Sequence, residues 1–257
     1  MGIGKIFINI CPVMHQMIEK FLKSLSRKKK ANLPKHIALT YNNYAAKGVK
    51  IPLEQHFKNK LAKINDFMGI QSKYDIPIFT IFLLSSETKN NENFNTIVDA
   101  VSAFFEELAH EKKIHHNKVK ISVLGKWYNM PAKLVDSIKK LSEETKEYDK
   151  FFLNFCINYD GQDEIVDACR ILGKKIKAEK MDPEAITKEM IKENLYSSYF
   201  MPPELLIVMD GAKHLSGFLL WDSVNAKVYF SDKNWSDFSA NDLVKALAQF
   251  HKWNGKG

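Results

Sequence analysis

The sequence predicts an α/β protein with a single domain, built on a mostly parallel six-stranded sheet flanked by helices. Six short runs are apolar almost throughout and rich in β-branched and aromatic residues, which is typical of strands buried on both faces. Amphipathic helical patterns lie between most of these runs, as in folds that alternate strands and helices. With 257 residues, of which 45% are hydrophobic, the chain is long enough to bury one large core.

The predicted strands follow one another after residue 33. They are HIALTY (36–41), IPIFTIFLLS (76–85), KVKISVLG (118–125), KFFLNFCIN (150–158), ELLIVM (204–209) and KVYFS (227–231). The clearest helical patterns between them cover residues 94–113 and 130–147. Because no linker divides this stretch, residues 34–257 are predicted to form one domain.

Residues 1–33 are predicted to form an N-terminal amphipathic helix and a basic linker. Apolar side chains recur at helical spacing from Val13 to Leu25, Pro12 suits the first turn, and SRKKK follows. One interpretation is a helix packed on its own domain or on a partner. The other is an interfacial helix, in which residues 12–30 contact a membrane and place their basic side chains over anionic headgroups.

Composition narrows the function classes. The net charge of +8 suits anionic ligands such as diphosphates or acidic lipids, whereas no nucleic-acid-binding motif occurs, so no nucleic-acid partner is predicted. The three cysteines, Cys11, Cys156 and Cys169, have neither CxxC spacing nor paired histidines, which argues against disulfides and structural zinc. No apolar run reaches the roughly 20 residues of a spanning helix. These features predict a cytoplasmic protein, with peripheral membrane contact through the N-terminal helix as the alternative location.

The candidate site is expected at the carboxyl ends of the strands, where ligands bind in open parallel sheets. These ends read NN (42–43), SSET (85–88), GKWYN (125–129), NYDGQDE (158–164) and MDGAKH (209–214).

Several of these segments, in order, resemble motifs of the cis-prenyltransferases, the family of undecaprenyl and dehydrodolichyl diphosphate synthases. LSSETKN resembles the family's FSTEN segment, NFCINYDGQDEI resembles NIAxNYGGRxEI, and residues 214–238 follow RxSNFLLWQxxYxExYFxxxxWPDF almost residue for residue. The likeness spans about residues 20–257. It implies the family's fold and the condensation of an allylic diphosphate with isopentenyl diphosphate. In that reaction an aspartate fixes magnesium, and arginines and a serine clamp a diphosphate.

Most positions that carry this chemistry are substituted here. Asn42 stands where the resemblance implies the magnesium-binding aspartate, and Lys227 stands where it implies a glutamate. Asp210 replaces the diphosphate-binding serine, and two like charges about 4 Å apart repel by about 4 kcal/mol at an effective dielectric near 20. The other substituted positions are Thr88, Asn91, Val208 and His214.

The resemblance also identifies retained positions. His56, Ser85 and Gly211 match substrate-binding positions of the family. A larger set matches positions interpreted as packing residues: Phe218, Leu219, Leu220, Trp221, Tyr229, Phe230, Trp235 and Phe238. A retained fold with substituted chemistry predicts a catalytically defective homologue, resembling the Nogo-B receptor type of non-catalytic subunit.

Such a subunit would need no cofactor of its own, because Mg²⁺ would lie in an active cis-prenyltransferase partner that acts on prenyl diphosphates. The family's dimer surface, around residues 218–238, is also compatible with a homodimer. The resemblance further implies a tail that reaches into the partner's site. Its counterparts here are Lys252, Trp253, Asn254, Gly255 and Lys256, with tryptophan in place of the family's arginine.

Two alternatives stay open. Four acids, Asp160, Asp163, Glu164 and Asp210, could converge at the strand ends and bind Mg²⁺ in this chain, giving a repurposed, terpene-cyclase-like enzyme that acts on a prenyl diphosphate. Acids at a helix start are also ordinary dipole-compensating residues. The second alternative is a non-catalytic protein that binds an isoprenoid or another lipid in an apolar tunnel.

Overall fold

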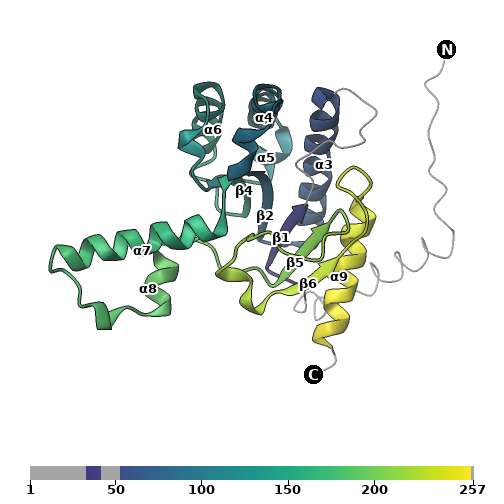
Figure 1. Ribbon diagram of the computed structural model, residues 1–257. Coiled ribbons are helices and arrows are strands. Elements are labelled where there is room, and N and C mark those ends of the chain that lie inside the picture. Colours follow the sequence, from purple (N-terminus) through teal and green to yellow (C-terminus); the bar gives the residue numbers. More distant parts are fainter. Residues whose placement is uncertain (1–32, 42–52, 256–257) are drawn as a thin grey trace, which may run out of the picture.

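The computed structural model describes residues 33–41 and 53–255, which form an open parallel sheet with packed helices (Figure 1). The sheet order is β3-β4-β2-β1-β5-β6, and every pair of neighbours is parallel. The predicted fold class and all six predicted strands are confirmed. The strands are β1 (His36–Tyr41), β2 (Ile78–Ser85), β3 (Val119–Leu124), β4 (Phe151–Tyr159), β5 (Leu205–Met209) and β6 (Lys227–Phe230).

Helices connect the strands as the amphipathic patterns predicted. The pattern over residues 94–113 forms two helices, because the chain turns at His110, and the pattern over 130–147 forms one. The helices are α3 (Leu53–Tyr74), α4 (Phe94–Ala109), α5 (Lys112–His116), α6 (Ala132–Glu144), α7 (Gly161–Lys177), α8 (Lys188–Glu193) and α9 (Ala240–Asn254). Short 3-10 turns are η1 (Ser86–Asn90), η2 (Trp127–Asn129), η3 (Pro183–Ala185) and η4 (Asp222–Asn225).

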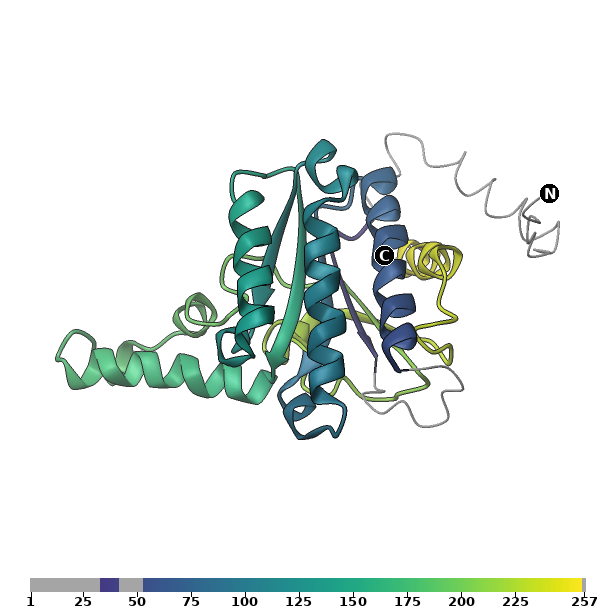
Figure 2. The ribbon, with the colours of Figure 1, turned by 90° about the horizontal axis from the view of Figure 1, so that it is seen from above.

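The two faces of the sheet are covered differently. Helices α3, α4, α6 and α9 bury their apolar sides in the larger core, and α3, α4 and α6 lie side by side in Figure 2. The opposite face is covered largely by irregular segments around residues 196–200 and 212–219. There Phe218 stacks on Phe82, with ring centroids 5.2 Å apart, and contacts Tyr159 edge-on. Large aromatic side chains therefore cover this face of the sheet, whereas helices cover the other face.

Helices α7 and α8 and the turn between them project from the body of the domain (Figures 1 and 2). We call residues 161–193 the arm. Helix α7 begins directly after β4, and the side chain of Asp160 caps it by accepting hydrogen bonds from the amides of Gln162 and Asp163. Gly161 is required here, because a Cβ atom on this residue would lie 2.0 Å from the carbonyl oxygen of Gly217.

Some predictions concern residues outside the described ranges. The N-terminal helix and linker, the membrane contact through residues 12–30, and Asn42 all lie there, so these stay predictions. Within residues 33–41 and 53–255, no helix is both long enough and apolar enough to cross a membrane.

Candidate functional site at the strand ends

Asp210 lies immediately after β5 with a φ of +64°, a conformation that aspartate adopts more readily than most residues. Its Oδ1 accepts a hydrogen bond from the backbone N–H of Trp235, 3.1 Å away, and its own N–H donates to the carbonyl of Lys233. Its Oδ2 is buried with no hydrogen-bond partner. Burial, and then the charge of Asp210, raises the pKa of Tyr41 at the end of β1. The carboxyl group of Asp210 is therefore held in place by the backbone of the loop that contains Lys233 and Trp235.

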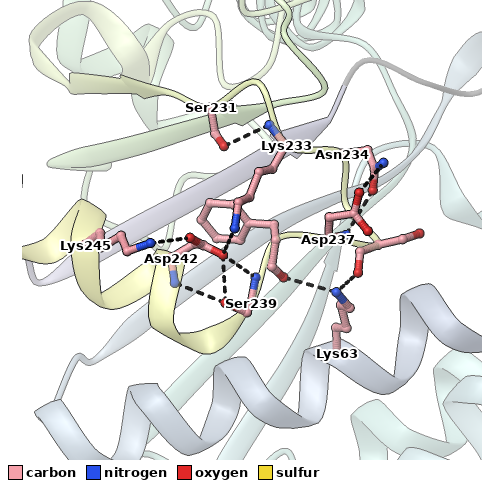
Figure 3. A network of polar contacts seen from close by, with 10 residues as sticks. Lys63, Ser231, Lys233, Asn234, Asp237, Ser239, Asp242 and Lys245 are labelled. Carbon is pink, nitrogen blue, oxygen red and sulfur yellow. Dashed lines mark hydrogen bonds and ion pairs between the residues drawn. The ribbon is translucent and has the colours of Figure 1, made fainter. Parts of the chain in front are cut away.

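The segment that holds Asp210 is itself fixed by a polar network (Figure 3). Burial pushes the pKa of the Asp242 carboxyl up, but hydrogen bonds from Lys233, Ser239 and Lys245 outweigh it and hold this pKa well below its usual range. Ser239 and Asp242 also form a capping box at the start of α9. The loop between β6 and α9 is therefore tied to the helix that follows it.

Lys63 of α3 joins the same loop to the body of the domain. Its ammonium group donates to the carbonyl oxygens of Ser236 and Phe238 (Figure 3). Burial lowers the pKa of Lys63, with the nearby carboxylates of Asp237 and Asp66 opposing the change. The backbone N–H that faces Asp210 is consequently positioned by both α3 and α9.

The positions that match FSTEN lie at the end of β2. Ser85 and Thr88 are buried, and their hydroxyl oxygens are 3.3 Å apart. The side-chain oxygen of Asn91 accepts from the amide of Asn93, so it supports the start of α4. His56 lies in α3, and its side chain is outside the described part of the structure.

The segment that matches the basic motif offers little positive charge to a ligand. Val208 stands at the position of an arginine and is 1% exposed in the second core cluster. Gly211 donates its N–H to the carbonyl of Ser231, and His214 contacts the hydroxyl of Ser216 on the surface. The neighbouring Lys213 pairs with Asp232, 3.1 Å away.

The four acids of the alternative site are separated. Asp160 caps α7, Asp163 pairs with Lys126 at 2.9 Å, and Glu164 is buried and accepts hydrogen bonds from Tyr159 and Ser197. Asp210 ends β5, and β2 and β1 lie between β4 and β5 in the sheet. Among the described residues no group of three or more His, Cys, Asp or Glu side chains is arranged to hold a metal ion. The expected convergence is therefore not found there.

The described side chains at the strand ends do not form a magnesium site like the one that the resemblance implies. Magnesium requires hard oxygen ligands, normally including carboxylates. At the position of the expected glutamate, Lys227 brings a cation, and the described residues hold no group of three or more His, Cys, Asp or Glu side chains that could bind a metal ion. The described residues do not fit a magnesium ion, so no step through a metal is derived for this chain.

Lys227 instead contacts the end of α9. Its ammonium group donates to the side-chain oxygen of Asn254 and lies 5.2 Å from the centroid of the Phe250 ring. Lys252 and Trp253 are exposed in the last turn of α9, and Gly255 ends it. Lys256 lies outside the described residues. The predicted tail thus begins on a helix that is packed along its own domain.

The sequence did not predict a cluster of buried and half-buried polar side chains. Lys192 of α8 donates to Oδ2 of Asp222 at 2.6 Å, and the hydroxyl of Ser197 donates to the same oxygen at 2.7 Å. The amide of Ser197 donates to Glu164 of α7, which also accepts from Tyr159 of β4. The one indication of this cluster in the sequence was Asp222 in LLWD, an acid at a position where the family motif has glutamine.

Large apolar side chains are exposed in one stretch of the chain. Eight of the ten such side chains in the described residues lie between positions 166 and 230, and we call them the apolar surface. Leu220 and Phe230, interpreted from sequence as packing residues, belong to it, whereas Phe218, Leu219, Trp235 and Phe238 are buried as expected. Apolar side chains that stay exposed are candidates for contact with a partner where they gather in a patch. The apolar surface comprises Val166, Ile171, Ile186, Tyr199, Met201, Leu220, Val224 and Phe230.

The parallel sheet and the polar side chains at its strand ends define an α/β protein with a candidate site at the carboxyl edge of the sheet. A family model described as "Putative undecaprenyl diphosphate synthase" matches residues 42–256, and the chain belongs to this family. It is the cis-prenyltransferase family indicated by the sequence motifs.

Relatives agree with this assignment, and a solved structure shares the fold. The chain is 29% identical over 249 residues to a tritrans,polycis-undecaprenyl-diphosphate synthase (geranylgeranyl-diphosphate specific) of Methanopyrus kandleri, covering 95% of this chain and 91% of the relative. It is 30% identical over 232 residues to an isoprenyl transferase of Prochlorococcus marinus subsp. pastoris, covering 88% and 84%. The structure of lavandulyl diphosphate synthase from Lavandula x intermedia superposes with a TM-score of 0.81 at 22% identity, covering 86% of this chain and 96% of that one. The last comparison concerns the fold alone.

Proposed function

We propose that this chain is a catalytically defective cis-prenyltransferase homologue that acts as an accessory subunit of a polyprenyl diphosphate synthase. The observation that carries the proposal is the reversal of charge at two positions of the site. Asp210 brings a negative charge where the motif has a serine, and Lys227 brings a positive charge where it has a glutamate. Both side chains make contacts within the chain, so each substitution is built into the fold.

Ionisation of an allylic diphosphate depends on cations and oriented N–H donors around the leaving group. In the segment that matches the basic motif, one arginine position is the buried Val208 and the other is the exposed His214. An uncharged core residue cannot hold a diphosphate oxygen. These features support a chain that does not catalyse prenyl transfer by itself.

The apolar surface supports the existence of a partner. Tyr199 is 94% exposed and Val224 is 80% exposed, although both are large apolar side chains. The apolar surface includes side chains of the arm and of the segment between β5 and β6. The second group lies within residues 218–238, where the resemblance implies that the family pairs its subunits. An active cis-prenyltransferase subunit would cover these side chains and supply the Mg²⁺ site, and the assembly would act on prenyl diphosphates.

The test is incorporation of isopentenyl diphosphate into farnesyl diphosphate with Mg²⁺. The full chain would be assayed alone and mixed with an active cis-prenyltransferase from the same cell, with diphosphate release followed in parallel. The expected result is no turnover alone, together with a higher rate or a longer product in the mixture. No effect in the mixture would contradict the proposal.

A matched pair of variants connects the effect to the apolar surface. Val224→Glu places a charge on an exposed side chain and is expected to abolish the rate increase without unfolding the chain. Lys139→Glu, an exposed position on α6, is the control and should leave the increase unchanged. Release of diphosphate by the chain alone would instead favour the repurposed enzyme, and bound isoprenoid without turnover or a partner would favour the lipid-binding protein.

A further inference from the structure

The arm projects from the domain and is joined to it by a chain of hydrogen bonds, in addition to the ion pairs of Lys126 with Asp163 and Asp167 of α7. Tyr159 of β4 donates to Glu164 at 2.5 Å, and Glu164 accepts from the amide of Ser197 at 3.2 Å. Ser197 and Lys192 then donate to the same oxygen of Asp222, at 2.7 and 2.6 Å. These five residues join β4, α7, the turn after α8, η4 and α8.

The ion pair at the end of this chain joins a half-buried lysine to a buried aspartate. The side chains of Lys192 and Asp222 are 21% and 3% exposed. The ammonium of Lys192 has further acceptors in the carbonyl and the hydroxyl of Ser197. Burying such a pair costs desolvation that an apolar pair of similar size avoids, so its main effect need not be stability. The pair instead fixes the orientation of α8 relative to η4, because charged hydrogen bonds have defined geometry.

We infer that Lys192 and Asp222 are positioning residues that hold the arm at one angle to the sheet, so that its apolar side chains meet the partner subunit as a preformed surface. We call this pair the clasp. It connects α8 to η4, the turn that contains the exposed Val224. The clasp thus sets the arm and the segment between β5 and β6 in one arrangement. An interface that is already arranged before binding loses less conformational entropy on association.

This inference rests on the proposed function for the identity of the partner, and for nothing else. The angle of the arm is a property of the chain alone and can be measured without one. Spin labels would be placed on Cys169, which is exposed on α7, and on a cysteine introduced by Lys140→Cys on α6. Cys11→Ser removes a third reactive position, while Cys156 is buried.

The expected result is a narrow distance distribution in the otherwise unchanged chain. Lys192→Met should broaden it and weaken binding to the active subunit about tenfold, as expected when a preorganised surface becomes variable. Lys133→Met is the matched control, because it removes an ion pair with Asp99, 2.7 Å long, between α6 and α4 in the body. This control should leave both the distribution and the affinity unchanged.

A double variant separates positioning from stability. Lys192→Met with Asp222→Leu replaces the clasp by an apolar pair, which should return the unfolding free energy close to that of the unchanged chain. The inference expects the distance distribution to stay broad. It is overturned if this distribution is narrow, if Lys192→Met leaves the arm at a single angle, or if the broadened variant binds the active subunit as tightly as the unchanged chain. If the unchanged chain does not bind the active subunit, the proposed function and the role of the clasp in docking fail together, while the distance measurement still reports the angle.

Discussion

The carboxylate of Asp210 accepts a hydrogen bond from the backbone N–H of Trp235, with 3.1 Å between Oδ1 and the nitrogen. This bond joins the end of β5 to the loop that leads into α9. It orients the acid, and hydrogen bonds to charged groups contribute about 1.5–3 kcal/mol. An acidic side chain is therefore a fixed part of this strand end, where the resemblance implies a diphosphate-binding serine.

Removing this charge should improve anion binding. Asp210→Asn keeps an oxygen that accepts from Trp235 and is expected to bind inorganic diphosphate about tenfold more tightly, because screening reduces but does not remove the repulsion. Isothermal titration calorimetry at low salt measures the affinity. Asp136→Asn, at an exposed position on α6, is the control with little expected change. Equal affinities for Asp210→Asn and the unchanged chain would refute the assigned role.

The close approach at the base of the arm gives a stability prediction. Gly161→Ala would place Cβ 2.0 Å from the carbonyl oxygen of Gly217 and is expected to lower the free energy of unfolding by about 1–3 kcal/mol. Gly173→Ala in the same helix meets nothing within 4 Å and should raise it by about 0.5–1 kcal/mol. Urea unfolding of both variants provides the comparison. Similar effects of the two substitutions would show that the contact is relieved without cost.

The network at the start of α9 predicts a dependence of stability on acid pH. The pKa of Asp242 is lower in the folded chain than its ordinary value, so its contribution is present above about pH 4 and is lost as pH falls below that. Asp242→Asn is expected to cost about 2 kcal/mol at pH 7 by removing charged hydrogen bonds. The difference from the unchanged chain, measured by thermal unfolding, should shrink between about pH 4 and pH 2. Asp237→Asn, on an exposed side chain, is the control, and a constant difference for Asp242→Asn would contradict the prediction.

His36 predicts a second pH effect in a different range. Burial lowers its pKa to about 4, while the hydrogen bond to the carbonyl of Met201 opposes this. Neutral His36 therefore contributes stability above about pH 6.5 that is lost as pH falls towards 4, at a cost of about 3 kcal/mol. In urea unfolding, His36→Gln should lose stability at pH 7 and show a weaker decline between about pH 6.5 and 4. His110→Gln, at an exposed position, should keep the decline of the unchanged chain, and an unaltered decline in His36→Gln would argue against the assignment.

The strands could be predicted because the pattern that specifies each one lies within a few consecutive residues. A parallel strand buried on both faces needs a run of apolar, β-rich residues, and each of the six runs supplies one. The burial of Phe218 and Trp235 followed in the same way from their apolar character. The exposure of Leu220 and Phe230 could not be predicted, because apolar residues that stay exposed are of the same types as those in a core.

The candidate site could likewise be predicted only in part. Which residues replace the family's charged positions can be read by comparing motifs in the chain. The sequence does not show whether four acids, Asp160, Asp163, Glu164 and Asp210, lie close together. That depends on how many strands separate β4 from β5 in the sheet. The contacts of Lys227 with Asn254 and Phe250 likewise join residues that no sequence pattern relates.

By itself, the sequence determined the α/β class, the six strands, the resemblance to the cis-prenyltransferases and the substituted chemistry, because each depends on residue types at fixed spacing along the chain. Only the tertiary structure decided that Asp210 faces Trp235, that Lys192 meets Asp222, and that the arm projects with exposed apolar side chains. These contacts join residues 25 to 30 positions apart. Their geometry is set by the packing of whole elements, which local hydrophobic periodicity does not encode.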